Sequence, residues 1–261
     1  MFPSRLVSVL GGGAGLQNNY SLAFDGSNDY VDTSSPFEST FKDSFTISSW
    51  VKPTDGRPSA YEYIYGIYGA SGGKNRITLI SGANGELNIR FRANDAGSGD
   101  SGGDTAAIWA DGESTWTHTV VVADSTISGN DGLVLYVNGV KTAIGGSGDT
   151  SAITFSDFNT THNFILGSAS VSSGVGTSNT FAGKLDEVAI YNTALSAGDI
   201  SALYQARGTS DLNDDGNSAN LQGWWRMGDG DTFPTITDNS TNSNDGTMTN
   251  MDAVDIVKDT P

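Results

Sequence analysis

The sequence predicts an all-β protein in which two antiparallel sheets pack face to face, with one short helix. Short segments rich in β-branched and aromatic residues recur along the chain, which is the pattern of strands. Turns rich in glycine, serine and asparagine separate them, and glycine alone accounts for 34 of the 261 residues. One segment has helical spacing. Closely spaced strands with frequent turns and a single helix favour a β-sandwich.

Composition limits the size and the partners of this domain. A chain of 261 residues can form one large β domain with a buried core, or one domain with a small appendage. Its formal net charge of −17, from 13 basic and 30 acidic residues, repels a phosphate backbone, so we expect no nucleic-acid partner. There is no cysteine to form a disulfide, and no apolar run approaches the roughly 20 residues of a membrane span.

The N-terminal half alternates expected strands with turns. Residues 1–19 contain one arginine and a short apolar run before three glycines, which favours an uncleaved N-terminal arm over a signal peptide. The Gly/Ser/Asp-rich segment Asn94–Asp104 is expected to be a loop. The strands expected in this half are Tyr20–Phe24, Tyr30–Thr33, Ser44–Lys52, Tyr61–Tyr68, Arg76–Ile80 and Glu86–Phe91.

The C-terminal half continues in the same way as far as residue 182. A type I′ hairpin turn is expected at Asn138–Gly139, since both residues tolerate a positive φ. A second Gly/Ser-rich loop is expected at Ser170–Asn179. The strands expected here are Trp116–Ala123, Gly132–Val137, Val140–Ala143 and Asn163–Ser168.

Gly183–Tyr204 predicts a strand, a turn and the one short helix. Lys184–Tyr191 is largely apolar and β-prone. Ser196 stands where an N-cap would, and Asp199 three residues later makes an aspartate version of the capping box. Apolar residues then follow at helical spacing, so one helix face is expected to pack on the domain. Two adjacent acidic residues, Asp186 and Glu187, interrupt this apolar strand, and strand propensity does not explain their presence there.

Four sequence blocks, in order, resemble the laminin-G-like, concanavalin A-like jelly roll. They are L-A-F-D-G-S-N-D-Y-V at Leu22–Val31, F-T-I-S-S-W-V-K-P at Phe45–Pro53, W-T-H-T-V-V-V with L-Y-V-N-G between Trp116 and Gly139, and the segment beginning G-K-L-D-E-V-A-I-Y at Gly183. The resemblance covers residues 20–207 and implies a jelly-roll sandwich. It does not decide function, because this fold serves sugar binding, adhesion, glycan cleavage and architecture.

The C-terminal segment 208–261 resembles the opening of the same module, displaced to the end of the chain. Gly223–Asp229 reads G-W-W-R-M-G-D and Asp238–Met248 reads D-N-S-T-N-S-N-D-G-T-M. We therefore expect the segment to complete the same sandwich, as in a circular permutation, or to complete a neighbour's sandwich by strand exchange. A separate extension packed outside the domain is the alternative. The segment is also similar to tails of structural proteins from marine bacteriophages.

The resemblance implies a structural calcium site. In the resembled family the aspartate of F-D-G and the aspartate of L-D-E-V can share the ion, and these correspond to Asp25 and Asp186. The turn that begins at Asp25 adds the oxygens of Asn28 and Asp29, which are ligands that Ca²⁺ accepts. A cation would also remove the cost of a carboxylate inside a strand. The alternative is that Asp25 caps its own turn while Asp186 accepts backbone N–H groups.

A second metal candidate and a catalytic site have weaker support. Asp211–Asn217 reads D-L-N-D-D-G-N, which is the first half of an EF-hand loop, but Gln222 replaces the glutamate at position twelve. A solvated acidic linker is the alternative. No paired-carboxylate motif of a glycosidase is present, and Asp186 and Glu187 are expected to point to opposite faces. His118 is expected to be structural, so we expect no enzyme.

Aromatic side chains offer a sugar platform. Tyr61, Tyr63 and Tyr65 are spaced by two, so they are expected to share one face of a strand, and exposed rings stack on the C–H faces of sugars. Burial of that face in the core or a subunit interface is the alternative. Trp109, beside a Gly/Asp loop, is the tryptophan expected to be exposed.

The combined features favour a non-enzymatic interaction module on the surface of a virion, such as a capsid- or tail-attached decoration or fibre protein. Its expected partners are other virion proteins or copies of itself, and cell-surface glycans are a further candidate. One alternative is a secreted, extracellular carbohydrate-binding module. The other is a glycan hydrolase or lyase whose acids converge from distant loops.

Overall fold

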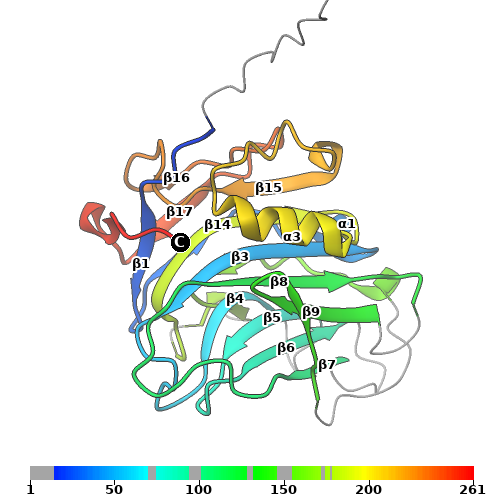
Figure 1. Cartoon of the computed structure of the whole chain (residues 1–261), viewed down its shortest axis with the longest axis horizontal. Helices are drawn as coiled ribbons and strands as arrows, with labels where there is room; N and C mark the ends of the chain where they lie inside the picture. Colours follow the sequence, from blue (N-terminus) through cyan, green and yellow to red (C-terminus); the bar gives the residue numbers. More distant parts are fainter. Residues whose placement is uncertain are drawn as a thin grey trace, which may run out of the picture.

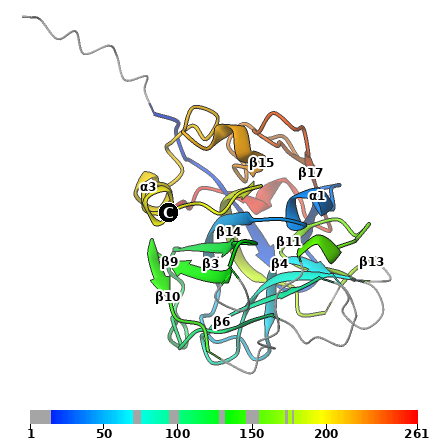
Figure 2. The ribbon, with the colours of Figure 1, turned by 90° about the vertical axis from the view of Figure 1, so that its right-hand side faces the viewer.

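The computed structural model describes residues 15–69, 75–93, 101–127, 132–145, 155–171, 174–176 and 178–261, and the statements below concern these residues. The N-terminal residues 1–14 of the predicted arm lie outside them. The chain forms two β-sheets packed face to face (Figures 1 and 2). This is the antiparallel sandwich that the sequence predicts.

The first sheet has the strand order β10-β9-β8-β3-β14-β1-β18. The long strand β14 pairs with β3 along one edge. Along its other edge β14 pairs first with β1 and then with β15, which therefore lie end to end. The bounds are β1 Ser21–Asp25, β3 Phe45–Pro53, β8 Thr117–Ala123, β9 Leu133–Val137, β10 Val140–Thr142, β14 Ala182–Tyr191, β15 Leu221–Trp225 and β18 Ile256–Val257.

The second sheet has the order β16-β17-β2-β11-β4-β5-β6-β7, and the short strands β12 and β13 join it beside β4. Part of the segment 94–104, which was expected to be a loop, forms β7 because it pairs with the edge of β6. The bounds are β2 Tyr30–Asp32, β4 Glu62–Tyr68, β5 Arg76–Ser81, β6 Leu87–Arg92, β7 Ser101–Asp104, β11 Ile165–Leu166, β12 Ser170–Val171, β13 Gly174–Val175, β16 Thr235–Ile236 and β17 Gly246–Thr249.

Aromatic rings fill the space between the two sheets. Phe41 and Phe45 have ring centroids 4.9 Å apart in an edge-to-face arrangement, and Phe91 stacks on Phe158 at 5.7 Å. These side chains are almost completely buried. Each buried aromatic side chain contributes about 2–3 kcal/mol through the hydrophobic effect. The core is therefore large enough to stabilise the domain without disulfides.

Helix α3 (Ala197–Ala206) covers the outer face of the first sheet (Figure 1). The predicted capping box is confirmed: the Ser196 hydroxyl accepts the Asp199 N–H, and the Asp199 carboxylate accepts the Ser196 N–H at 3.0 Å. Ile200 packs with Tyr191 and Trp224 in a second apolar cluster on this outer face. The other described helices are short: α1 (Glu38–Phe41) and the 3₁₀ turns η2 (Phe155–Asp157), η3 (Ser218–Asn220) and η4 (Ala253–Asp255).

The C-terminal segment lies within the sandwich and pairs with strands of its own chain. Trp224 and Trp225 of β15 pair with Ala189 and Val188 of β14. Strand β17 pairs with β2 in the second sheet, and β18 pairs with β1 in the first. Near the end of the chain, the Asp259 carboxylate accepts hydrogen bonds from Lys52 of β3 and Lys184 of β14. The segment therefore supplies strands to both layers.

The acidic pair in β14 does not alternate as expected. A β-bulge lies between Asp186 and Ala189, and Glu187 adopts a left-handed φ of 47°. A bulge inserts an extra residue and re-aims the side chains around it. As a result Glu187 lies beneath the C-terminal segment, where its carboxylate accepts hydrogen bonds from Trp224 and Arg226. Asp186 and Glu187 are both buried and close enough for their charges to interact.

Candidate sugar-binding groove

A groove of about 550 Å³ opens on the outer face of the second sheet, across β4, β5 and β6. We call it the tyrosine groove. Its volume lies within the usual range for small-molecule sites. The aromatic, charged and amide side chains that line it are Tyr61, Tyr63, Tyr68, Arg76, Glu86, Asn88 and Arg90.

Strand alternation sets which side chains reach the groove. In β6, Leu87, Ile89 and Phe91 point into the core, so Asn88 and Arg90 between them point outward. This alternation is visible in the sequence, but Asn88 and Arg90 were not predicted as site residues. Their neighbours across the sheet are Ile80 and Thr78 of β5 on one side and β7 on the other.

The strand β4 departs from alternation, and this corrects one predicted site residue. The register with β5 shifts between Tyr63 and Tyr65, so Tyr63 faces Ile80 and Tyr65 faces Leu79. The bulge turns Tyr65 into the core, where it is fully buried. The prediction that Tyr65 shares a binding face with Tyr61 and Tyr63 is therefore wrong. Tyr68 takes its place in the groove.

Three tyrosine rings form one wall. The rings of Tyr61 and Tyr63 meet edge to face, with centroids 5.6 Å apart, and Tyr63 lies 6.3 Å from Tyr68. Tyr61 is 48% exposed, which is unusual for a large apolar side chain of this protein. The phenol of Tyr63 is protonated at neutral pH and can donate a hydrogen bond, and burial raises its pKa further, to about 12. An exposed ring beside a phenol donor suits a sugar ring.

The polar side chains of the groove are held by fixed partners. The Arg76 guanidinium lies 4.6 Å from the centroid of the Tyr68 ring, and its Nε donates to the Thr78 hydroxyl at 3.1 Å. Arg90 donates to the Asp104 carboxylate at 3.0 Å. Glu86 accepts the N–H of Asn84 at 2.9 Å. Such contacts hold hydrogen-bonding groups in place before a ligand arrives, which lowers the cost of binding.

Trp109 is not part of an exposed platform. It is 2% exposed and packs in the core. Its indole N–H donates to the Thr117 hydroxyl at 3.0 Å. The prediction that Trp109 is exposed, which was based on the neighbouring Gly/Asp loop, is therefore wrong. The sequence near Trp109 could not reveal this, because its hydrogen-bond partner Thr117 lies at the start of β8.

The structure does not bring Asp25 and Asp186 together. Asp25 pairs with Ala182, and Asp186 lies four residues farther along β14, so about 13 Å of strand separates them at roughly 3.3 Å per residue. Asp25 instead caps its own turn and accepts the Ser27 N–H at 2.7 Å, which lowers the pKa of its carboxyl. The proposed shared calcium site therefore does not fit this geometry.

The other predicted metal ligands also have protein partners. Asp29 is buried and accepts the Asp25 N–H at 2.9 Å, while the Asn28 carbonyl accepts the side-chain amide of Asn250. Asp186 accepts the Asn18 amide at 3.0 Å, and burial, with the charge of Glu187, raises the pKa of its carboxyl well above the usual range. Among the described residues, no three His, Cys, Asp or Glu side chains are arranged to hold a metal ion.

The remaining candidates have local roles in the described part of the chain. In the EF-hand-like loop, Asp211 accepts the N–H of Asn213 and Asp215 accepts the N–H of Asn217, as in ordinary Asx turns. His118 is buried with its Nε2 2.9 Å from the Ser48 hydroxyl, and burial lowers its pKa to about 3. No described helix has the length and apolar character needed to cross a membrane.

A family model described as the concanavalin A-like lectin/glucanases superfamily matches residues 25–201. A sequence search of curated proteins finds no match. The sandwich is similar to solved structures at low sequence identity, so those similarities concern the fold.

One similar structure is that of a Bacteroides ovatus protein proposed to bind carbohydrate, with a TM-score of 0.63 and 20% identity. The match covers 94% of this chain, and this chain spans 60% of that protein. Another is the CBM40 of the Ruminococcus gnavus IT-sialidase, with a TM-score of 0.55 and 19% identity, covering 74% of this chain and all of that one. The same CBM40 has been solved bound to α2,3-sialyllactose.

Proposed function

The chain belongs to the concanavalin A-like lectin/glucanases superfamily, and on that premise we propose that it is a carbohydrate-binding module that holds a glycan in the tyrosine groove. The observation that carries this proposal is the groove itself. An exposed tyrosine and two half-buried ones line a cavity of about 550 Å³ whose other walls carry arginine, asparagine and glutamate side chains.

The chemistry of the groove suits a sugar better than a purely apolar ligand. Tyrosine rings offer flat apolar surface for the C–H groups of a sugar. Asparagine, glutamate and arginine offer donors and acceptors for hydroxyl groups. The printed names of two similar structures, a CBM40 and a protein proposed to bind carbohydrate, support the same class of ligand.

The charge of the groove bears on which glycan binds. Among the described residues, Arg76, Arg90 and Glu86 are the charged ones that line it, and Arg90 forms an ion pair with Asp104 at 3.0 Å. The two arginines are among only 13 basic residues in a chain of net charge −17. The glycans to be screened should therefore include both neutral sugars and sugars that carry a carboxylate.

The test is a glycan array followed by titration calorimetry on the glycans that bind. Tyr61→Ala and Tyr63→Ala should each weaken binding roughly fivefold or more, since loss of one stacking contact costs about 1 kcal/mol or more. Tyr136→Ala is the matched control, because Tyr136 is a half-buried tyrosine on β9 of the other sheet. Unchanged affinity in both groove variants, or equal loss in the control, would contradict the proposal.

We also propose that the module binds without cleaving its ligand. The proposal rests on the sequence, which lacks the paired-carboxylate motif of a glycosidase. Release of reducing sugar from polysaccharides is the readout, and sustained release by the purified chain would show an enzyme instead.

The virion-surface role is a second candidate, which rests only on the resemblance suggested by the sequence of the C-terminal segment; none of the similar structures described above is a phage protein. In that role the module would attach to other virion proteins or to copies of itself. A module secreted to the cell exterior would use the same groove. Light scattering separates an assembling subunit, which forms a defined multimer, from a monomeric binding module.

A further inference from the structure

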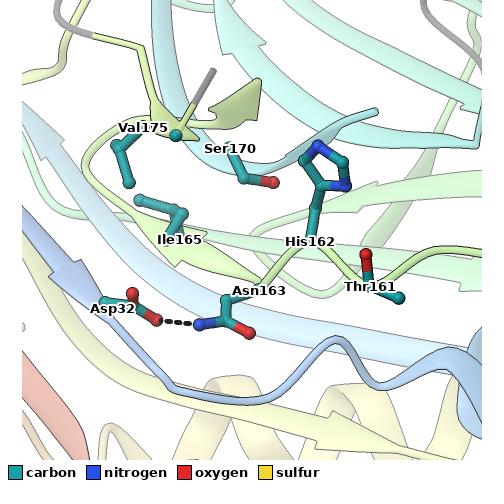
Figure 3. Close-up of a pocket in the computed structure, with 8 residues that line it drawn as sticks. Asp32, Thr161, His162, Asn163, Ile165, Ser170 and Val175 are labelled. Atoms are coloured by element: carbon teal, nitrogen blue, oxygen red, sulfur yellow. Dashed lines mark hydrogen bonds between the residues drawn. The ribbon is translucent and has the colours of Figure 1, made fainter. Parts of the chain in front are cut away.

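A second pocket opens on the outer face of the same sheet, over β2 and β11 (Figure 3). We call it the polar pocket. Alternation places it on the outside: Val31 and Leu166 belong to the core, so Asp32 and Ile165 beside them face outward. Its volume is about 290 Å³, at the lower limit for a small-molecule site.

Two polar side chains of this pocket are fixed before any ligand binds. The Asp32 carboxylate accepts the Asn163 side-chain amide at 2.9 Å and the Ser34 N–H at 2.8 Å. Ser34 has a left-handed φ of 57°, which non-glycine residues rarely adopt. Backbone strain of this kind persists only where the surroundings hold it in place. The Asp32 carboxylate thus has both a backbone and a side-chain donor in the absence of a ligand.

The pocket presents hydrogen-bonding groups from opposite sides. Figure 3 shows the Asp32–Asn163 pair on one side and the side chains of His162 and Ser170 on the other. The exposed hydroxyl residue Thr161 and the apolar side chain of Ile165 complete this part of the lining. No lysine or arginine is among the described residues that line it. These groups suit the hydroxyls of one uncharged sugar ring.

The polar pocket lies beside the tyrosine groove. Ile165 of β11 pairs with Gly66 of β4, and Ser170 pairs with Ile67, the residue before Tyr68. Tyr68 lines the groove. Neighbouring strands are about 4.8 Å apart, so the span from β2 to β4 is roughly 10 Å. One molecule made of linked sugar rings can reach both places.

We propose that the polar pocket is a second subsite of the same glycan site, so that the ligand is an oligosaccharide rather than a single sugar. One ring stacks on the tyrosines, and a neutral ring farther along the ligand hydrogen-bonds to Asp32, Asn163 and His162. This inference rests on the proposed function. It adds that the ligand has several sugar rings and that the ring in the polar pocket is uncharged.

The test is a glycan array that carries length series, from mono- to hexasaccharide, of several neutral and acidic polysaccharides. The full chain and its His162→Ala, Asp32→Asn and Tyr63→Ala variants are compared, with Lys141→Ala on the exposed strand β10 as control. His162→Ala and Asp32→Asn should weaken binding of long ligands about three- to tenfold, which is the loss expected for one hydrogen bond. They should leave disaccharide binding within about twofold.

The outcomes separate this inference from the proposed function. Tyr63→Ala should weaken ligands of every length, because the stacking ring is common to all of them. If mono- or disaccharides bind as tightly as hexasaccharides, or if His162→Ala and Asp32→Asn change nothing, the second subsite is refuted while the groove stands. If the wild-type chain binds no glycan on the array, the proposed function fails and the subsite fails with it. Melting temperatures of the variants identify any loss caused by unfolding.

Discussion

Replacing Arg226 with methionine tests the buried ionic network that joins the C-terminal segment to β14. The Arg226 guanidinium donates to the Glu187 carboxylate at 3.0 Å and to the backbone carbonyl of Gln17 at 2.7 Å. Glu187 also accepts the Trp224 indole N–H at 2.7 Å. The side chains of Arg226 and Glu187 are 9% and 7% exposed. The pair therefore links β14, β15 and the chain that leads into β1.

The magnitude follows from the charge that Arg226→Met leaves behind. Removing one partner of a buried pair costs about 3–5 kcal/mol, because the remaining Glu187 carboxyl must either stay charged without compensation or take up a proton. For a domain of this size, 1 kcal/mol shifts the melting temperature by about 2–4 °C, so we expect a loss of roughly 6–20 °C. Methionine keeps much of the apolar volume, so lost packing contributes little to this change.

The pH dependence gives the experiment a second readout. Burial raises the pKa of Glu187 to about 7, although Arg226 and Trp224 act in the opposite direction. When folding raises the pKa of a carboxyl, the folded protein disfavours the charged form of that group. The folded state is therefore most stable below the pKa that the group has in the unfolded chain, and it loses stability as the pH rises through the pKa that the group has in the folded protein. Without Arg226 the pKa of Glu187 rises further. The difference between wild type and variant should therefore be larger at about pH 8 than at about pH 5.

The assay is thermal unfolding of both proteins at the two pH values, followed by circular dichroism. Arg57→Met is the control, since Arg57 is an exposed residue on a loop outside this network. A loss below about 1 kcal/mol, or a loss that does not grow with pH, would refute the reasoning that Glu187 is held as a buried carboxylate by Arg226.

Three further outcomes are expected in melting experiments. Hydrogen bonds from Lys184, Lys52 and Trp116 outweigh partial burial and lower the pKa of Asp259 to about 2. Asp259→Asn should therefore cost about 1–2 kcal/mol near neutral pH, discounted for exposure, and the difference should vanish as pH falls from about 4 towards 2. Ser196→Ala removes the α3 cap and should cost about 1 kcal/mol, whereas Ser196→Gly should cost only a few tenths. EDTA should shift the melting temperature by less than about 1 °C, since the predicted calcium ligands do not converge; a drop of several degrees would restore the calcium hypothesis.

Local patterns in the sequence were sufficient to predict α3 and the longer strands, but not β7, β12 and β13, which form within segments that were expected to be loops. Alternation and turn residues depend on neighbours in the chain, so β3, β8 and the β9–β10 hairpin lie where they were expected. The capping box of α3 is equally local, and Ser196 and Asp199 form it as predicted. These elements needed no knowledge of what packs against them.

Two wrong predictions arise where a β-bulge adds one residue to a strand and so changes the face to which the following side chains point. The bulge after Tyr63 turns Tyr65 into the core, and the bulge at Glu187 buries two carboxylates that alternation would separate. A period-two pattern cannot reveal such a shift, because the shift is stabilised by partners on other strands. Trp109 was misplaced for a different reason: it lies outside the strands, and its hydrogen-bond partner Thr117 belongs to strand β8.

The two candidate sugar sites were only partly visible in the sequence. Tyr61 and Tyr63 were predicted as binding residues and do line the tyrosine groove. The arginines reach the groove from β5 and β6, and the polar pocket combines Asp32 with residues about 130 positions later in the chain. Only the strand order of the second sheet brings these segments together.

A crystal structure of the chain with a glycan selected on the array tests the proposed binding site most directly. We expect one sugar ring against Tyr61 and Tyr63, with hydroxyl groups in contact with the polar side chains of β5 and β6. A glycan held instead at the loops of the sandwich rim or on the face covered by α3, with the tyrosine groove empty, would contradict the account.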